Sequence, residues 1–357
     1  MKRKENDMKR FISMAAVLLL LCGLLPTAAL AADSYAQPAP AQALKSLGLF
    51  RGTDNGLELD RAPTRMESII MLIRLLGKDT EALISHYDFP FTDAPTWFNA
   101  DRYVGYAYAN GLTNGTSEKT LSPNNTADMR TVVTLTLRAL GYTDGENGSV
   151  WDNWETIAAD AGLLKDFDNA ELSSFLRGDA ARVYFAALDC RMADGKSTLA
   201  DTLIENEVFT KEQYATAKKI AAGSVTLSGS SLEDIGSAVY ATAEGSFNSS
   251  SIVGTAITKD NEKFYLGTEG LDFVEGYAFE PMMTAQAHSL CLVRMKPGAD
   301  IEAAKKAIRE NVDPRKWICV GVEEENIRVV SSGDLILLVM DNYYSDALVN
   351  SFSALAK

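Results

Sequence analysis

Residues 106–142 read YAYANGLTNGTSEKTLSPNNTADMRTVVTLTLRALGY, and this stretch contains two segments with helical character separated by a polar loop. The first segment runs up to Gly111, a residue that commonly ends a helix because it adopts positive φ at little cost. From Met129 onward, apolar residues recur at the spacing that places them on one face of a helix. The stretch therefore predicts a helix-loop-helix unit.

The same pattern occurs once before and once after this stretch. The copies read ALKSLGLFRGTDNGLELDRAPTRMESIIMLIRLLG (43–77) and TIAADAGLLKDFDNAELSSFLRGDAARVYFAALD (156–189). Their short first helices are predicted to end at Gly48 and Gly162. A repeat of about fifty to sixty residues indicates stacked supersecondary units that share a core. We place three copies at about 43–77, 89–142 and 151–189, within residues 43–195.

The second helix of the first copy has a well-marked start. Thr64 suits the N-cap position, and Glu67 completes an S/T-x-x-E capping box before the apolar run. The box does not require Arg65, which would stand beside free backbone N–H groups at the positive end of the helix dipole. Such a place can hold an anion, although a solvated surface charge is the commoner role of a first-turn arginine.

The region before the central unit adds a distinctive motif, FPFTDAPTWFNADRYV (89–104), which contains F-x-D-x-P-x-W. Together with the run YAYANGLTNGTSEKTLSPNN, it resembles the S-layer homology domain, by which many Gram-positive surface proteins hold the cell wall. The resemblance implies an all-α domain whose three helix-loop-helix copies pack as a pseudo-threefold prism. It also implies an acidic secondary cell wall polysaccharide, often ketal-pyruvylated, as the ligand in grooves between copies.

The resemblance also suggests which residues bind the polysaccharide. The family's T-R-A-E motif corresponds to Thr64-Arg65-Met66-Glu67 in copy one and, more loosely, to Leu176-Arg177-Gly178-Asp179 in copy three. Its arginine is a binding residue, so Arg65 and Arg177 inherit that role with Thr64 and Glu67 beside them; a guanidinium fork meets a carboxylate in two hydrogen bonds. In copy two, Met129 takes the arginine's position and Arg130 points about 100° further round the helix. We expect that groove to be weakened or lost.

Three further residues complete the expected binding set. Gly111 and Gly115 permit the positive φ of tight turns near the grooves. Trp97 has two readings, because it can stack on a sugar or fill the core, and we favour the core for so large an apolar side chain.

The N-terminus and the charge balance indicate where the protein acts. Residues 1–31 have a basic start, an apolar run and an A-x-A site, so they predict a secretory signal peptide cut after Ala31, followed by a leader at 32–42. No later stretch is long enough to span a membrane. The net charge of −14 argues against nucleic acid or anionic lipid as a bulk partner. No motif predicts a cofactor, and no spacing predicts a metal site.

The C-terminal part has a different pattern. Residues 196–230 follow a predicted helix and are polar and Gly/Ser-containing, so we interpret them as a linker. Residues 231–357 predict an α+β domain, with helices at 231–245, 299–311 and the C-terminus and strands at 271–279, 287–296, 326–331 and 334–341. The runs FEPMMTAQAHSLCLVRMKPGAD and NVDPRKWICV resemble an uncharacterised domain family of exported Firmicute proteins, which implies no chemistry.

The residues of the C-terminal part give little support to catalysis. His288 precedes Ser289 in a strand, where neighbouring side chains face opposite sides, so we interpret His288 as structural. Cys291 and Cys319 are expected to be buried free thiols, with a bridge between them left open. The sequence thus predicts a non-enzymatic, non-covalently anchored cell wall protein, with a wall-bound hydrolase as the alternative and self-association undecided.

Overall fold

The computed structural model describes residues 38–53, 55–145, 148–165, 167, 175–245, 251–283 and 285–356. All of them lie in one compact unit, Ala36–Lys357. The predicted signal peptide, the start of the leader and much of the loop of the third copy lie outside the described residues.

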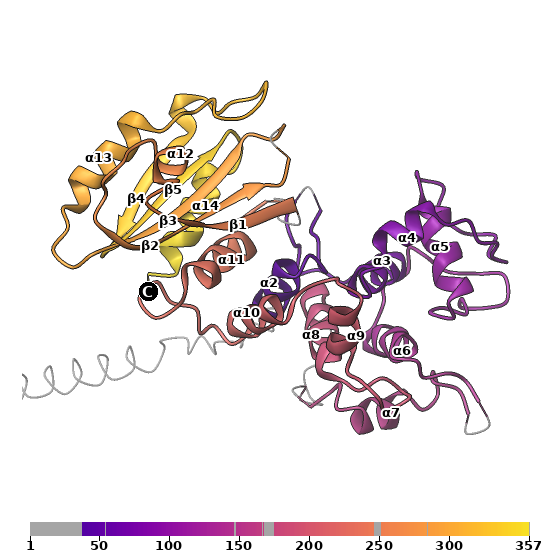
Figure 1. Ribbon diagram of the computed structural model, residues 1–357. Helices are drawn as coiled ribbons and strands as arrows, with labels where there is room; N and C mark the ends of the chain where they lie inside the picture. Colours follow the sequence, from indigo (N-terminus) through magenta and orange to yellow (C-terminus); the bar gives the residue numbers. More distant parts are fainter. Residues whose placement is uncertain are drawn as a thin grey trace, which may run out of the picture. The chain divides into compact units, whose positions relative to one another are not determined.

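The first half of the chain is helical throughout its described elements (Figure 1). The helices are α2 (Pro38–Ser46), α3 (Arg65–Leu75), α4 (Asp79–Ile84), α5 (Ala100–Ala109), α6 (Met129–Ala139), α7 (Trp154–Asp160), α8 (Arg177–Asp189), α9 (Leu199–Glu205) and α10 (Lys211–Ala221). Gly48, Gly111 and Gly162 have φ of 73°, 68° and 74° just after α2, α5 and α7. The predicted ends of the three short helices are therefore confirmed.

The first turns of α3 and α8 are held by backbone hydrogen bonds to a neighbouring copy. In each helix the first two N–H groups donate to two carbonyls of the neighbouring loop that lie two residues apart in the sequence. The bonds are Arg65 to Asn125 (2.8 Å), Met66 to Pro123 (3.0 Å), Arg177 to Arg61 (2.8 Å) and Gly178 to Leu59 (3.1 Å). Aligned on Arg65 and Met129, the carbonyls of Arg61 and Asn125 occupy the same position in their copies. Helix N–H groups that lack intrahelical partners are thus satisfied between copies.

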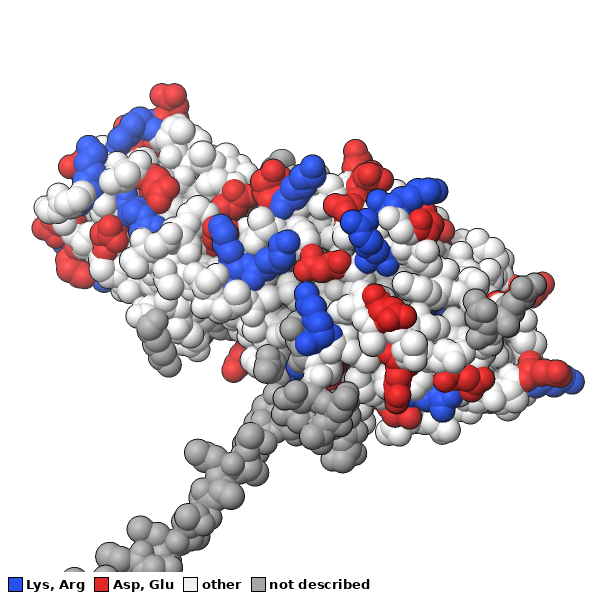
Figure 2. All heavy atoms as spheres, turned by 90° about the horizontal axis from the view of Figure 1, so that it is seen from below, with Lys and Arg blue, Asp and Glu red and all other residues white. Residues whose placement is uncertain are grey.

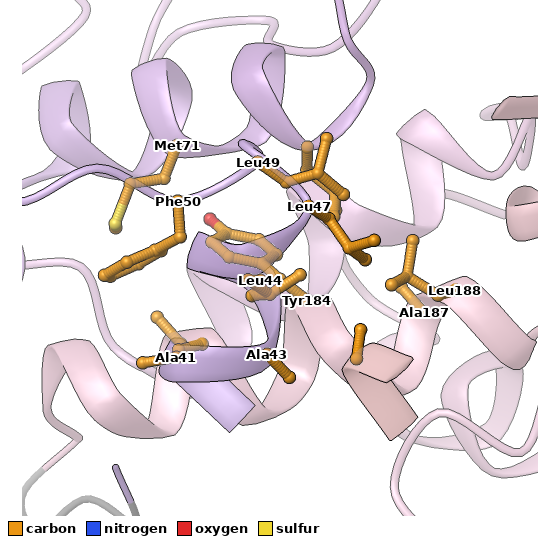
Figure 3. Packing of buried hydrophobic residues seen from close by; sticks show 14 of the residues in the cluster. Ala41, Ala43, Leu44, Leu47, Leu49, Phe50, Met71, Tyr184, Ala187 and Leu188 are labelled. Carbon is orange, nitrogen blue, oxygen red and sulfur yellow. The ribbon is translucent and has the colours of Figure 1, made fainter. Parts of the chain in front are cut away.

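Helix α2 packs against α8, and its buried residues belong to one hydrophobic core with those of α3 (Figure 3). Leu44 and Phe50 are each 1% exposed and pack with Tyr184 of α8, which is equally buried. The Tyr184 hydroxyl donates to the carbonyl oxygen of Ser68 at 3.0 Å, which connects α8 to α3. A buried tyrosine is stabilised when its hydroxyl has such a partner.

The segment 196–230 differs from the expected polar linker, because it contains α9 and α10. Thr198 and Thr210 form capping boxes with Asp201 and Gln213. Helix α10 packs against α2 and buries Tyr214. The polar composition reflects the solvent-facing sides of two short amphipathic helices.

The second half has helices on both faces of an antiparallel sheet, so the predicted α+β class is confirmed for this part (Figure 1). Its elements are α11 (Leu232–Thr242), β1 (Ile252–Ile257), α12 (Glu262–Leu266), β2 (Phe273–Pro281), β3 (His288–Met295), α13 (Ile301–Asn311), η2 (Glu324–Asn326), β4 (Ile327–Ser332), β5 (Leu335–Asp341) and α14 (Ser345–Ala354). The strand order is β1-β2-β3-β5-β4, with every neighbouring pair antiparallel.

Alternate residues of the central strands enter two different cores. Leu290 and Leu292 of β3 pack on the side of α11 and α14, whereas Cys291 and Val293 pack on the side of α13. Covering both faces explains why β3 and β5 are continuous apolar runs. Strand β1 and helix α12 were not predicted, since β1 is a short edge strand interrupted by Gly254, and glycine weakens the strand signal.

His288 lies at the start of β3 and is fully buried. Its Nε2 is 2.7 Å from the Tyr240 hydroxyl, and its Nδ1 is 2.8 Å from Oδ2 of Asp341. Burial raises the pKa of Asp341, but hydrogen bonds from His288 and from the backbone N–H of Tyr343 outweigh it and leave that pKa lowered. Both ring nitrogens of His288 therefore hold α11, β3 and β5 together inside the core.

The cysteines differ from the expectation at one position. Cys291 is a buried free thiol, and burial raises its pKa to about 11. Cys319 is free but exposed, so the expectation of a buried thiol was wrong there. Its φ of 62° is incompatible with a strand, and it lies in the loop between α13 and η2. The apolar run WICVGV therefore contains an exposed thiol in a loop.

Within the described residues, we find no helix that is both apolar and long enough to cross a membrane. On the face drawn in Figure 2, basic and acidic side chains are interspersed, without a large basic area.

The cysteine environments predict different thiol reactivities. In a native chain starting at Ala32, Cys319 should react rapidly with an aromatic disulfide reagent. Cys190 and Cys291 should react only after unfolding, because burial keeps them protonated and inaccessible. Cys319→Ser should remove the rapid phase of absorbance change. A rapid phase that persists in this variant would contradict the assignment.

Candidate functional site

A pocket of about 330 Å³ lies between the N-terminus of α3, the loop after α5 and one face of α6. Its lining residues are Arg65, Gly115, Thr116, Thr131, Thr134, Leu135, Arg138 and Trp151. Arg65 thus comes from the first predicted copy, Trp151 from the start of the third, and the remaining lining residues from the second.

Arg65 reaches from the first turn of α3 into this pocket. Its Nη2 donates to Thr113 Oγ1 at 3.1 Å and to the Gly115 carbonyl at 3.2 Å. The residue is 7% exposed, and among the described residues its Nε has no hydrogen-bond partner. Burial, assisted by the nearby charge of Arg138, lowers the pKa of Arg65. An arginine stays protonated under such conditions, so the pocket contains a buried cation.

Arg138, in the last turn of α6, supplies a second cation. Its side chain is 10% exposed, and its Nη2 lies 3.4 Å from Asp144 Oδ2. Asp144 also accepts hydrogen bonds from Asn114 Nδ2 (3.1 Å) and from the backbone N–H of Val150 (2.7 Å). This carboxylate therefore connects the α5 loop, α6 and the segment before α7, which together form the pocket walls.

Hydroxyl groups and an indole complete the lining. Thr134 Oγ1 is buried, and in the described part of the chain it has no hydrogen-bond partner. Trp151 is 37% exposed and lies under the Arg130 guanidinium, 4.2 Å from the ring centroid. Arg130 Nε also donates to the Trp151 carbonyl at 3.0 Å. Arg130 thus lies outside the pocket lining, as the helical geometry predicted, but it positions one wall.

The contribution of α6 to the pocket was not predicted from the sequence. Thr131, Thr134 and Arg138 are spaced so that they share a helix face. Polar residues at this spacing within the apolar run TVVTLTLRAL were a usable signal.

Thr64 and Glu67 form the predicted capping box. Thr64 Oγ1 accepts from the Glu67 N–H at 3.1 Å, and Glu67 Oε2 accepts from the Thr64 N–H at 2.8 Å. Glu67 also lies 2.5 Å from Arg61 Nη2 and 3.4 Å from Arg177 Nη1. Burial raises the pKa of Glu67, but hydrogen bonds from Arg61 and Thr64 outweigh it and lower the pKa to about 2. Neither Thr64 nor Glu67 lines the pocket of Arg65.

Arg177 occupies a different environment from Arg65. It is 2% exposed, its Nε donates to the Leu57 carbonyl at 3.2 Å, and its guanidinium lies 5.7 Å from the Phe50 ring centroid. Its charge is paired with Glu67. The structure therefore does not bring the two expected binding arginines into one pocket.

Of Trp97, Gly111 and Gly115, only Gly115 lines the pocket of Arg65. Trp97 is 47% exposed and outside the pocket lining, so the preference for a core position was wrong. Its ring centroid lies 6.4 Å from that of the buried Tyr103. Gly115 lines the pocket with φ of 76°, and its carbonyl accepts from Arg65. Gly111 ends α5 and does not line the pocket.

A second hollow, of about 780 Å³, surrounds Met129 between α6 and α7. Its lining includes Arg130 and Lys165 but also Asp128 and Glu155. Met129 itself is 9% exposed and offers no group that pairs with a carboxylate. The hollow thus lacks a buried cation at the position that Arg65 holds in the first groove.

Comparison with known proteins identifies one stretch of the chain. Residues 90–128 match the family model of the S-layer homology domain. The resemblance inferred from F-x-D-x-P-x-W and the following run is confirmed for this stretch. The match includes Gly115 and Thr116 of the pocket and ends just before α6.

Three known proteins have related sequences. The chain is 26% identical over 183 residues to a surface layer protein of Brevibacillus choshinensis, covering 48% of this chain and 16% of the relative. It is 29% identical over 177 residues to a cell surface protein of Thermoanaerobacter kivui, covering 48% and 23%. It is 27% identical over 158 residues to the middle cell wall protein of Brevibacillus brevis, covering 41% and 15%. The chain thus spans less than a quarter of the length of each relative.

The lowered pKa of Glu67 predicts an acid-dependent contribution to stability. A carboxylate with a depressed folded-state pKa stabilises the fold above its unfolded pKa, about 4.5, and this stabilisation is lost as pH falls towards about 2. Glu67→Gln should lower the free energy of unfolding by about 2 kcal/mol at neutral pH, after allowance for solvent screening. In denaturant titrations, the difference from wild type should shrink between pH 4.5 and 2. A difference that stays constant across this pH window would contradict the assigned contribution of Glu67. Glu302→Gln, at an exposed site, is the control.

The two glycines predict unequal costs of an added methyl group. A Cβ at Gly115 would lie 2.4 Å from the Phe91 ring and 2.6 Å from the Thr120 carbonyl, whereas one at Gly111 would meet nothing within 4 Å. Both alanines pay for positive φ, about 1–2 kcal/mol. Gly115→Ala should cost at least about 1 kcal/mol more in thermal or denaturant unfolding, because the loop must shift. Equal losses would show that the close contacts at Gly115 relax freely.

Proposed function

We propose that the chain attaches non-covalently to the cell wall by holding an acidic group of a wall polysaccharide in the Arg65 pocket. The observation that carries this proposal is a pair of buried polar atoms, Arg65 Nε and Thr134 Oγ1, that find no hydrogen-bond partner among the described residues, in a pocket with two guanidinium groups. Buried polar groups are nearly always hydrogen-bonded, and unpaired ones call for an explanation. A bound ligand that accepts from Arg65 and bonds to Thr134 provides one.

The chemistry of the lining favours a carboxylate on a sugar. Two arginines supply N–H donors in planar forks that suit carboxylates. The threonine hydroxyls suit sugar hydroxyls, and the partly exposed Trp151 offers an apolar face. A volume of about 330 Å³ is at the small end of ligand pockets, which favours one acidic sugar residue, such as a sugar that carries a pyruvate ketal. The overall negative charge is no obstacle, since the anion is held locally.

The match at residues 90–128 and the names of the relatives support attachment at the cell surface. In our proposal, the signal peptide at 1–31 is cleaved after Ala31, and secondary cell wall polysaccharide is the partner. The equivalent hydrogen bonds made by α3 and α8 to neighbouring copies support a pseudo-threefold arrangement.

The C-terminal α+β part is displayed at the surface in this proposal. A wall-bound hydrolase has no specific observation in its favour among the described residues. His288, the residue on which a histidine mechanism would depend, is fully buried with both ring nitrogens in hydrogen-bond contact.

Purified cell walls test the proposal directly. The chain starting at Ala32 should sediment with walls that retain their secondary polysaccharide. It should stay in the supernatant after that polymer has been removed chemically. Binding that survives the removal would exclude the polysaccharide as the partner.

Arg65→Met tests the pocket. Methionine is the residue at the equivalent position of the second copy, Met129, so the fold should accept it. Loss of a charge-assisted hydrogen bond costs about 1.5–3 kcal/mol, and we expect wall affinity to fall about tenfold to a hundredfold. Arg51→Met, at an exposed arginine paired with Asp79, is the matched control. Arg130→Ala should have a smaller effect than Arg65→Met. Equal losses for Arg51→Met and Arg65→Met would refute the assignment.

A further inference from the structure

The antiparallel sheet of the second half has two edge strands, β1 and β4, which differ in their protection (Figure 1). The residues of β4 are buried or half-buried, and helices α13 and α14 both pack on it. Its Arg328 also pairs with Asp346 at 2.8 Å. Charged side chains and covering elements are the usual protection of an edge strand. Strand β4 is therefore closed to a further strand.

Strand β1 is open along the side that faces away from β2. Its four central residues, 253–256, are exposed. In an antiparallel pair, every second residue directs its N–H and C=O groups away from the partner strand. Among the described residues, only one hydrogen bond reaches the β1 backbone from outside the sheet, from Asn261 Nδ2 to the Ala256 carbonyl at 3.1 Å. The outer edge of β1 therefore offers backbone donors and acceptors to a further strand.

The sequence around β1 contains no charge. Residues 245–258 read GSFNSSSIVGTAIT, without Asp, Glu, Lys or Arg, although 23% of the chain is charged. The net charge of −14 opposes the approach of two copies in general. Along this stretch two copies can meet without like charges directly opposite each other, an arrangement that would be destabilising.

Exposed apolar side chains border the same edge. Val253 is 43% exposed, and Phe264 of α12 is 54% exposed. The Phe264 ring centroid lies 5.0 Å from that of Tyr265, whose hydroxyl is hydrogen-bonded to Thr255 of β1. A strand added alongside β1 would remove part of this apolar surface from water, which favours its addition.

We propose that β1 is a dimerisation edge, and that its partner is β1 of a second copy of this chain, running antiparallel so that the two sheets become one. An edge strand is complementary to itself in this orientation, because each copy supplies the donors and acceptors that the other needs. Antiparallel pairing also places Lys259 beside the uncharged residues that precede the partner's β1. The proposal does not depend on the Arg65 pocket. A dimer would carry two such pockets, so in the proposed function it would hold the wall polymer at two points.

The sheet also sets the size and strength of the assembly. Each copy has one open edge among its described strands, so pairing two copies uses both edges and gives a closed dimer. The contact is limited to one strand and its adjoining side chains, below the roughly 1,200 Å² of a standard interface. We therefore expect a weak dimer, with a Kd of about 10–100 μM.

Sedimentation velocity of the chain starting at Ala32 tests the dimer. Between about 5 and 500 μM, the mean sedimentation coefficient should rise from that of a monomer towards that of a dimer. Val253→Lys combined with Ala256→Lys places cations on both faces of the open strand and should weaken dimerisation at least about tenfold. Ile84→Lys combined with Phe98→Lys adds the same charge at exposed apolar positions of the helical part, and this control should dimerise as wild type does. Circular dichroism checks that each variant is folded.

Hydrogen exchange of the unaltered chain keeps the test decisive if the β1 variant does not fold. Amides within 252–257 should exchange about threefold more slowly at about 500 μM than at about 5 μM, because their outward N–H groups gain carbonyl partners in the dimer. Amides within 327–332, in β4, should exchange equally at both concentrations.

Four results would overturn the proposal. The first is a wild-type chain that remains monomeric at about 500 μM. The second is a dimer that the folded Val253→Lys, Ala256→Lys variant retains, or that the control pair loses equally. The third is a dimer without added protection at 252–257. The fourth is an assembly larger than two copies, because one open edge in each copy closes with a pair.

Discussion

Two backbone hydrogen bonds at the start of α3, from Arg65 to Asn125 and from Met66 to Pro123, set the geometry on which the candidate site depends. They satisfy N–H groups that a helix cannot satisfy internally. They also fix the first turn of one copy against the loop of the next. Arg65 lies at this junction, and its side chain extends to the loop that contains Thr113 and Gly115.

The junction explains how a guanidinium comes to be buried. Taking an arginine out of water is costly unless its donors find partners. The Thr113 hydroxyl and the Gly115 carbonyl supply part of the compensation, and both belong to the loop fixed by the junction. These contacts hold the guanidinium in place, and its Nε has no hydrogen-bond partner among the described residues. Arg177 has the same backbone arrangement, but its compensation includes a carboxylate. Equivalent backbone geometry is therefore combined with different hydrogen-bond partners at the two arginines.

Local signals in the sequence predicted much of the fold. Helix ends at Gly48, Gly111 and Gly162, the capping box at Thr64, and the strands around Gly333 all depend on near neighbours. The errors arose where tertiary contacts decide. Cys319 belongs to an apolar run but lies in a loop, and Trp97 is half exposed. Helix α10 was not predicted because its sequence is mostly polar, although its apolar side packs on α2. Arg65 was identified from its position, whereas Thr134 and Arg138 belong to the same pocket only because α6 faces α3. The pairing of Arg177 with Glu67 connects residues 110 positions apart, and no single-copy pattern contains it.

The pocket is built from residues of more than one predicted copy, and this has a thermodynamic consequence. Neither copy alone contains both Arg65 and the lining from α6, so the site exists only while the junction is formed. A ligand that binds the assembled site and not the separated copies stabilises the junction by mass action. In the proposed function, attachment would then protect the helical part from opening, and the chain would be hardest to unfold or to cleave by proteases at this pocket.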